Sequence, residues 1–371
     1  MKKQLVLIGG GHAHMTTLAN LHLFLAKGYN ATVIGPSPHH YYSGMGPGML
    51  AKVYHPEETR FDTQRVVEKQ GATFVLGKAV RIDARAKIVH LADGTALPYD
   101  VLSCNAGSSV PQTLPGMETA QELFSVKPIE RLMEAQAHLL TLAGQKRIHV
   151  AIIGGGPSAV EVAGNVWRLL HDAKVAPPQI TVFAGSTLMP KQPEPIRSRA
   201  QRSLTRRGIE IISPARVREI KDGTIVLDSG STHGADLIFL ALGIRPSPLF
   251  ADSGLATGPD GGLLVNEYLQ CPEYPEIFGG GDCIHFKPQP LDKVGVYAVR
   301  QNPVLLHNLL ASLEGMPLEK FEPGGDYLLI YNLGDDTGIL RKRGLIFGGR
   351  IAFWLKDYID RRFMRKFQAS Q

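Results

Sequence analysis

The chain has 371 residues, of which 44% are hydrophobic and 20% are charged, as in a soluble globular protein. This length accommodates two domains of ordinary size, and no run of 18 apolar residues indicates a transmembrane helix. The net charge is +6, but nine Lys/Arg and two Asp between residues 341 and 366 give that segment alone +7, so the remainder is close to neutral.

The first predicted element is an apolar strand over residues 4–8, followed by Gly9-Gly10-Gly11 and a helical pattern that extends to about residue 26. Glycine permits the sharp reversal from strand to helix, and it lets the backbone approach a pyrophosphate at the helix N-terminus. Strands at 31–34, 71–75 and 99–107 complete the unit. The third position of the turn should be small, and His14 departs from that pattern.

The same plan occurs a second time. A strand over residues 148–153 leads into Gly154-Gly155-Gly156 and a helical pattern to about residue 170, and strands at 180–183, 208–212 and 235–243 follow. One glycine-rich turn is weak support for nucleotide binding, but two turns in parallel arrangements are strong support. The sequence therefore predicts an α/β fold with two Rossmann-like domains, the second inserted in the first.

Both units lack the acidic residue that would bind a ribose hydroxyl about 20 residues after the turn. The first returning strand ends at Gly35-Pro36-Ser37, and the second ends at Ala184-Gly185-Ser186-Thr187. Two interpretations of the second unit stay open. It prefers NADPH through Ser186, Thr187 or Lys191, or it has lost nucleotide binding.

A third glycine cluster lies at residues 277–283, where an apolar strand ends in glycines and Asp282. A carboxylate there suits hydrogen bonds from a polyol such as the ribityl chain, although a plain strand-to-loop turn explains the cluster equally well. With this element the chain resembles the flavoproteins that have two dinucleotide-binding domains, in the branch of type II NADH dehydrogenases and sulfide:quinone oxidoreductases. The matching motifs are residues 9–11, 105–107, 154–161 and 281–282.

The resemblance implies that FAD binds to the first unit and to the stretch after the second, and it implies the following contacts. FAD is assigned to Gly9, Gly11, Ala13, His14, Ser37, Ser43, Val80, Ala106, Gly107, Gly281, Asp282, Lys293, Gly295 and Val296. NAD(P)H is assigned to Gly154, Gly156, Pro157, Ser158, Ala159 and Gly243. Two residues receive catalytic roles: Lys293 is expected near the flavin N1/O2 edge, where a cation stabilises the anionic reduced ring, and Glu161 is expected near the hydride-transfer face.

The predicted domain boundaries follow from the same resemblance. The FAD domain comprises residues 1–112 and 268–320, the NAD(P)-like domain comprises residues 113–267, and a C-terminal α/β extension with a basic amphipathic helix comprises residues 321–371. Residues 42–48 and 356–364 further resemble a subgroup in which some relatives are fused ahead of a selenophosphate synthase domain.

The cysteines disfavour thiol chemistry. Cys104, Cys271 and Cys283 form no C-x-x-C motif, which indicates a reducing compartment. Disulfide reductases carry a cysteine pair shortly after the first glycine motif, where residues 36–60 have none, and sulfide:quinone oxidoreductases carry one after the "GD" element, where this chain has none. Two roles are open for His39 and His40 beside Tyr41-Tyr42: they line the flavin pocket, or, as we favour, they are surface or packing residues. No spacing indicates a metal site.

The basic C-terminal segment allows two explanations. Ile351, Trp354, Leu355, Tyr358 and Ile359 form an apolar stripe at helical spacing, which Arg362 and Lys366 then interrupt. Either the helix lies on an anionic membrane surface, or it docks on the FAD domain. A nucleic-acid partner is not expected, because no aromatic-basic interleaving accompanies the charge.

The expected activity is electron transfer from NAD(P)H through FAD to a quinone-type acceptor, in a cytoplasmic protein that can lie on the inner face of the cell membrane. One alternative is quinone-linked oxidation of a reduced sulfur or selenium compound without NAD(P)H. The other is a non-catalytic, flavin-binding interaction module. The oligomeric state is not predicted.

Overall fold

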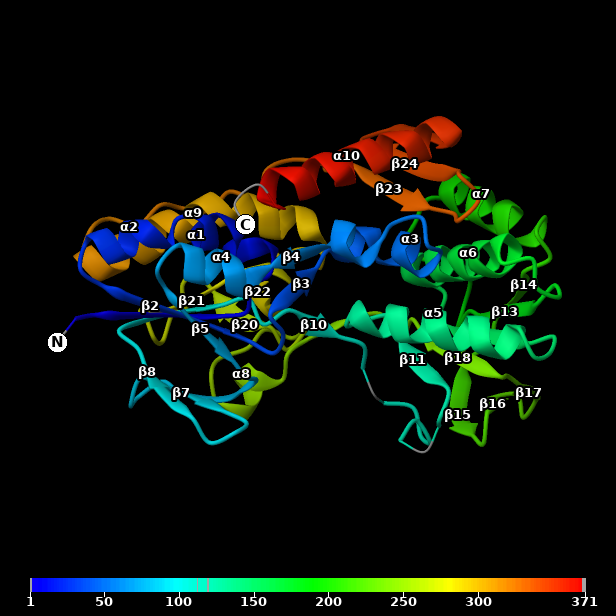
Figure 1. Cartoon of the computed structure of the whole chain (residues 1–371), viewed down its shortest axis with the longest axis horizontal. Coiled ribbons are helices and arrows are strands. Elements are labelled where there is room, and N and C mark those ends of the chain that lie inside the picture. The colour runs from blue at the N-terminus through cyan, green and yellow to red at the C-terminus, as the bar shows by residue number, and fades with distance from the viewer. Residues whose placement is uncertain (1, 112, 119, 369–371) are drawn as a thin grey trace.

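The computed structural model describes residues 2–111, 113–118 and 120–368. Two five-stranded parallel sheets form two units that lie side by side along the long axis (Figure 1). The first sheet has the order β21-β9-β1-β2-β5 and the second has the equivalent order β11-β18-β12-β13-β14. The predicted α/β fold with two Rossmann-like sheets is confirmed.

The strands and their main helices have the following bounds. The first unit contains β1 (Gln4–Ile8), β2 (Asn30–Gly35), β5 (Thr73–Leu76), β9 (Val101–Cys104) and β21 (Ile277–Gly279), with helices α1 (Met15–Ala19), α2 (Leu21–Ala26), α3 (Gly46–Leu50), α4 (Thr63–Lys69), α8 (Leu249–Asp252) and α9 (Gly295–Glu314). The second unit contains β11 (Leu123–Ser125), β12 (His149–Ile153), β13 (Gln179–Phe183), β14 (Glu210–Ile212) and β18 (Leu237–Leu240), with helices α5 (Glu130–Ala143), α6 (Pro157–Asp172) and α7 (Glu194–Thr205).

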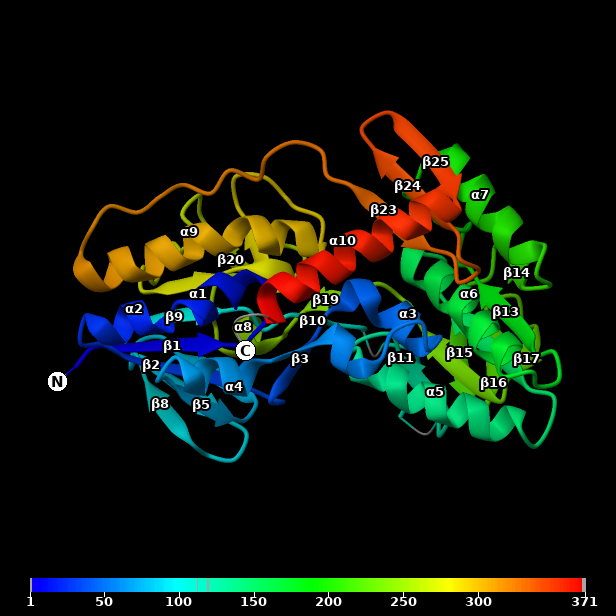
Figure 2. The ribbon, with the colours of Figure 1, turned by 45° about the horizontal axis from the view of Figure 1, so that its top comes forward.

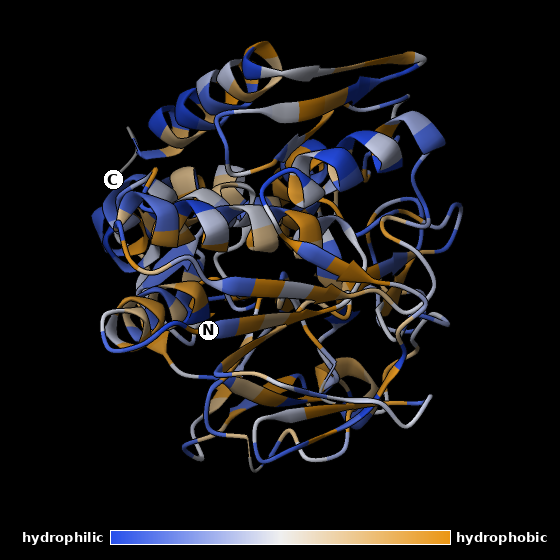
Figure 3. Cartoon of the chain, turned by 90° about the vertical axis from the view of Figure 1, so that its right-hand side faces the viewer, coloured by the Kyte–Doolittle hydropathy of each residue, from blue (hydrophilic) through white to orange (hydrophobic). Residues whose placement is uncertain are grey.

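Smaller sheets decorate these units. They are β3 (His39–Tyr41) with β4 (Arg60–Asp62), β6 (Ala79–Asp83) with β7 (Ile88–Leu91) and β8 (Ala96–Pro98), β15 (Val217–Lys221) with β16 (Thr224–Leu227) and β17 (Thr232–Gly234), and β20 (Leu263–Val265) with β22 (Ile284–Phe286). Viewed end-on, the long strands in the middle of the molecule are predominantly hydrophobic, and the C-terminal strands and helix form the top layer (Figure 3).

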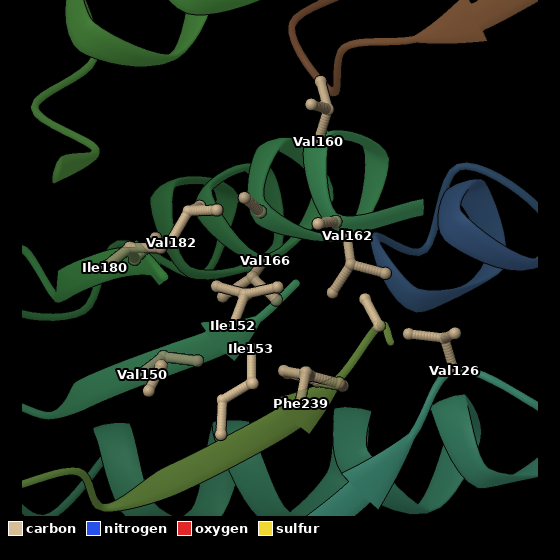
Figure 4. Close-up of a cluster of buried hydrophobic side chains, with 14 of the residues drawn as sticks. Val126, Val150, Ile152, Ile153, Val160, Val162, Val166, Ile180, Val182 and Phe239 are labelled. Carbon is tan, nitrogen blue, oxygen red and sulfur yellow. The ribbon is translucent and has the colours of Figure 1, made fainter. Parts of the chain in front are cut away.

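Each sheet has its own hydrophobic core, because parallel strands covered by helices on both faces bury nearly every side chain. In the second unit, Ile152 and Val150 of β12 and Phe239 of β18 pack against Val162 and Val166 of α6 (Figure 4). Val160, on the opposite face of α6, points toward the C-terminal extension. Helix α6 is therefore buried on two sides.

Two antiparallel crossing strands connect the units. β10 (Ser108–Ser109) leaves the first unit and pairs with β19 (Arg245–Pro246), which returns to it. The second unit is thus inserted in the first, as predicted. The return comes earlier than the predicted boundary at residue 267, because Phe250 and Val265 already pack in the core of the first unit.

The C-terminal extension joins the two units. The antiparallel strands β23 (Leu329–Asn332), β24 (Gly338–Lys342) and β25 (Leu345–Gly349) cover α6 and α7, and α10 (Arg350–Gln368) then runs from the second unit to the first (Figure 2). The contact between extension and α6 is close. A Cβ atom on Gly164 would collide with the backbone carbonyl oxygen of Leu333.

That contact predicts the effect of a small substitution. Gly164→Ala should destabilise the protein by about 1–3 kcal/mol, because the backbone of the extension must move to relieve the overlap, even though alanine is the better helix former by about 1 kcal/mol. Urea denaturation measures the change. Gly185→Ala is the matched control, since its Cβ would meet no atom within 4 Å. Equal or higher stability of Gly164→Ala would contradict the close contact.

Candidate functional site

The first glycine turn closes on the end of β9. Gly9 has φ +88°, and a Cβ on it would overlap the backbone carbonyl of Asn105, while a Cβ on Gly11 would overlap the Asn105 side chain. The Asn105 amide nitrogen donates to the carbonyl of Gly280 at 2.7 Å. Its Oδ1 is buried and has no hydrogen-bond partner among the described residues. This cradle therefore presents an unsatisfied acceptor beside glycine backbone.

His14 supports the turn from behind. One ring nitrogen lies 2.7 Å from the carbonyl oxygen of Gly9 and the other lies 2.8 Å from Ser103 Oγ, and the side chain is fully buried. Both ring nitrogens of His14 are thus engaged by protein groups, so the predicted contact of His14 with the cofactor stays a prediction for its backbone only. Histidine replaces the small third residue by bridging the turn to β9.

Asp282 lies in a polar cluster at the end of the third glycine motif. Its carboxylate accepts hydrogen bonds from Ser108 Oγ at 2.8 Å and from Lys127 Nζ at 2.9 Å. Burial is the largest single influence and opposes ionisation of Asp282, but the Lys127 charge and the hydrogen bonds from Lys127 and Ser108 together outweigh it and keep the pKa of the carboxyl below its usual value. Asp282 is thus an ionised acceptor, as a polyol ligand requires.

Lys127 was not identified from the sequence. It stands just before α5, in the stretch that enters the second unit, and its side chain reaches back to the first. The signal available was a lone lysine in Ser125-Val126-Lys127-Pro128, which also matches a solvated surface residue. Only the tertiary fold shows that it pairs with Asp282.

Lys293 lies at the start of α9 and lines a small cavity together with Asp282 and Gln301. Its ammonium group pairs with Asp260 at 2.8 Å and also donates to the carbonyl of Ile284. Gly295 and Val296 form the first turn of α9 beside it. The predicted location is therefore close to Asp282, but the charge of Lys293 is already paired in this structure.

The remaining predicted FAD residues occupy four places. Ala13 is buried next to Gly280, and Ala106 and Gly107 follow β9 at the cradle. Ser37 follows β2, where its hydroxyl accepts from the backbone N–H of His39 at 3.2 Å, and Val80 is exposed on β6. Ser43 begins a short 3-10 helix (Ser43–Met45), in which the carbonyl of Gly44 accepts from Lys356 of α10.

The second glycine turn has the same backbone path but opens to free space. Gly154 has φ +135°, and a Cβ on it would overlap the carbonyl of Ala241. Gly156 is the N-cap of α6 in an extended conformation, and its Cβ would meet no atom within 4 Å. Pro157, Ser158 and Ala159 form the first turn of α6, and Gly243 (φ +85°) also faces open space. The backbone N–H groups at this helix N-terminus are placed to receive a pyrophosphate.

Glu161 faces α10 from the second turn of α6. Its carboxylate accepts from the backbone N–H of Asn332 at 2.8 Å. Across from it, the buried Lys356 donates to Asp360 at 2.6 Å and to the Gly44 carbonyl at 2.7 Å, and Tyr42 donates to Asp360 at 3.0 Å. This network joins α6, α10 and the loop before α3.

Burial raises the pKa of Glu161 to about 6, against the lowering influence of Lys356. The folded protein then holds this proton more tightly than the unfolded chain does, so stability is lost as pH rises from about 4.5 to about 6. Glu161→Gln removes the titration. Between pH 4.5 and pH 7.5, the unfolding free energy of the variant relative to wild type should therefore improve by about 2 kcal/mol. Thermal unfolding at both pH values measures it, and a difference that does not change with pH would contradict the assignment.

The three cysteines are buried and unpaired. Burial raises the pKa of Cys283 to about 11 and raises that of Cys104 well above its usual value. Cys283 Sγ donates to the carbonyl of Cys104 at 3.4 Å. Thiols in this environment pack as small apolar groups and are poor nucleophiles.

Comparison with known proteins gives the family. The model of the pyridine nucleotide-disulphide oxidoreductases matches residues 3–302. Ferroptosis suppressor protein 1 of Taeniopygia guttata is 28% identical over 306 residues, covering 75% of this chain and 74% of the relative. Demethylphylloquinone reductase NdbB of Synechocystis is 27% identical over 301 residues, covering 77% and 73%.

Two solved structures share the fold over the whole chain. They are the sulfide:quinone oxidoreductase of Aquifex aeolicus (TM-score 0.81, 20% identity, 92% of that chain) and NDH2 of Plasmodium falciparum in complex with NADH (TM-score 0.82, 15% identity, 97% of that chain). The resemblance predicted from the motifs is confirmed.

FAD, the cofactor of this family, fits the first cradle. Gly9 and Gly11 let the turn pack closely against Asn105, the Asn105 Oδ1 lacks a partner, and Asp282 is ionised for a polyol. Since the family match spans most of the chain, the protein belongs to the pyridine nucleotide-disulphide oxidoreductase family and is an FAD-dependent oxidoreductase.

Proposed function

We propose that the protein transfers electrons from NAD(P)H through FAD to a quinone-type acceptor. The observation that carries the proposal is the second glycine turn. Gly156 opens to free space at the N-terminus of α6, in the geometry that receives a dinucleotide pyrophosphate.

The residues of the chain then have separate tasks. Gly9, Gly11 and Asp282 hold FAD, which supplies the hydride chemistry when bound. Gly154, Gly156 and the first turn of α6 hold the donor pyrophosphate. Glu161 lies on α6 between this turn and α10, where burial raises its pKa to about 6, so that it is mostly ionised at neutral pH and exchanges its proton just below it.

The relatives support the same assignment. The Plasmodium NDH2 structure contains NADH, and the Synechocystis relative is a demethylphylloquinone reductase. Sulfur or selenium oxidation without NAD(P)H is the second candidate, and the Aquifex structure favours it as a neighbour. The buried, protonated cysteines count against it. The non-catalytic module is set aside, because the family consists of oxidoreductases.

An anaerobic donor screen tests the proposal. FAD-loaded protein is mixed separately with NADH, NADPH and sulfide, and flavin absorbance is followed. Bleaching by NADH or NADPH within seconds is expected. Bleaching by sulfide alone would refute the NAD(P)H assignment and favour the second candidate.

We further propose that the outer face of α10 binds an anionic membrane surface. Within the described chain no helix is long and apolar enough to span a membrane. On α10, however, Ile351, Trp354 and Tyr358 are 73%, 65% and 45% exposed, whereas the charged pair Lys356 and Asp360 is buried. Exposed cations flank this apolar face, among them Arg343, Arg350, Arg362, Arg365 and Lys366. Large apolar side chains beside clustered cations are the pattern of an interfacial helix.

The two explanations of the basic segment therefore describe two faces of one helix. The inner face docks on the first unit, where Arg361 pairs with Glu58 and Gln368 donates to the carbonyl of Arg60. The outer face is free for the membrane. Arg362 and Lys366, which interrupt the apolar stripe in the sequence, are exposed like Trp354 and so belong to the outer face.

A further inference from the structure

An aromatic box lies where α10 meets the first unit. We define it as His12, His40, Tyr42, Phe61 and Phe363. The ring of Phe363, from the inner face of α10, stacks on His12 with centroids 5.5 Å apart and planes 13° apart. Tyr42 lies 5.2 Å from His12, and Phe61 contacts both histidine rings. The box directly follows the glycine turn of the FAD cradle.

Within the box the two histidines are hydrogen-bonded to each other. His40 Nε2 lies 3.3 Å from His12 Nδ1. Burial lowers the pKa of His12 to about 3 and that of His40 to about 4, so both rings are neutral at physiological pH. When His40 donates in this bond, the proton of the neutral His12 ring resides on Nε2.

His12 Nε2 is a buried polar atom without a partner in the described chain. The side chain is only 9% exposed, and the backbone around it is fixed, since Asn302 Nδ2 donates to the His12 carbonyl at 2.5 Å. Leaving a buried donor unpaired is costly. Asp282 and Lys127 of the FAD site are close enough to affect the charge of His12, so the unpaired atom lies near that site.

We propose that His12 and His40 form a proton-transfer pair, in which His12 Nε2 gives its proton to a carbonyl oxygen of the quinone and His40 replaces it at His12 Nδ1. The inference rests on the proposed quinone acceptor and names the residues that serve it. His12 directly follows the glycine turn of the FAD cradle. Its ring also stacks on Phe363 of α10, the helix whose outer face we propose to bind the membrane.

The protons and electrons balance. A quinone takes two electrons and one proton as a hydride equivalent from the reduced flavin, and it takes the second proton from His12 as the Nε2–H bond breaks and the O–H bond forms. The proton on His40 Nε2 moves to His12 Nδ1, and His40 takes one proton from solvent at Nδ1. Neither ring ends charged, and proton exchange with solvent restores both tautomers after the quinol leaves.

Half-reaction kinetics test the pair with His12→Phe and His40→Phe, which keep the aromatic stacking but lack the N–H groups. The FAD-loaded proteins are reduced anaerobically by the donor and then mixed with menadione or with ferricyanide, which takes electrons without a proton. His12→Phe should slow reoxidation by menadione at least about 100-fold, the usual contribution of general acid catalysis, and His40→Phe should slow it by a smaller factor. Reduction by the donor and reoxidation by ferricyanide should not change.

A second readout needs no turnover. In ¹⁵N-histidine spectra of the oxidised holoprotein, menadione should shift the His12 Nε2–H resonance, which is assigned by its loss in His12→Phe. Equal slowing with both oxidants, together with an altered flavin spectrum, would show that the His12 Nε2–H group donates to the flavin, and it would overturn the proposal. If ferricyanide reoxidises the reduced wild-type protein but menadione does not, the proposed quinone acceptor itself is refuted, before any variant is compared.

Discussion

Replacing Gly156 with leucine is expected to abolish reduction of the flavin by NAD(P)H while FAD stays bound. In the unliganded protein the leucine side chain has room, since a Cβ at this position meets no atom within 4 Å and the backbone φ of −81° suits any residue. The side chain instead occupies the space that a pyrophosphate needs. Displacement of the donor by about 1 Å already costs roughly 100-fold in rate, so a loss of at least that size is expected in anaerobic stopped-flow.

Gly234→Leu is the matched control, because this glycine also has open space around it but lies on β17, away from both glycine turns. The control should reduce at the wild-type rate. Both variants should keep the flavin absorbance and the unfolding temperature of wild type. Unchanged reduction of Gly156→Leu by NAD(P)H would show that the second turn is not the donor site.

The second large effect concerns the membrane face. Replacing Ile351, Trp354 and Tyr358 together with serine should weaken binding to anionic vesicles by about 100-fold or more. Loss of about 1 kcal/mol of apolar burial per side chain gives this factor, even for partial insertion. The cations contribute about 1 kcal/mol each near an anionic leaflet, so the remaining binding should fall as salt is raised. Vesicle cosedimentation measures both effects.

The triple variant should keep FAD and its reduction of soluble dyes, because the replaced side chains point away from the box. Leu23, Leu76 and Met316 are exposed apolar residues elsewhere on the chain, and their triple serine variant is the matched control. Removing all of α10 is a poorer test, since it also removes Lys356, Asp360 and Phe363 from the interior. Vesicle binding that the triple change leaves intact would refute the membrane face, and a dimer that dissociates instead would assign that face to a second copy.

The sequence predicted the two sheets because their signals are local. Each strand, turn and helix of a Rossmann unit is specified by neighbouring residues, such as β1 with Gly9 or β12 with Gly154, and repetition of the plan then reveals the architecture. The position of Asp282 was predicted for the same reason, since a strand end and a glycine cluster place it.

The parts that were missed depend on contacts between distant segments. Lys127 pairs with Asp282, 155 residues away along the chain. The buried Lys356 donates to the Gly44 carbonyl, and the buried Asp360 accepts from Tyr42. Docking of this helix on the FAD domain was one of the two explanations, but charged residues on a helix are expected outside, so the burial of Lys356 and Asp360 was not predicted. His40 was interpreted as a surface or packing residue. Its hydrogen bond to His12 could not be predicted, because it joins β3 to the glycine turn, two segments that only the tertiary fold brings together.

The stoichiometry of a complete turnover tests the central claim most directly. FAD-loaded protein on anionic vesicles that contain a lipid-soluble quinone is supplied with NADH or NADPH without oxygen, and both the oxidised nucleotide and the quinol are measured. The account predicts one quinol formed for each nucleotide oxidised, with Gly156→Leu inactive. Nucleotide that remains unoxidised while a reduced sulfur compound drives quinol formation would contradict it.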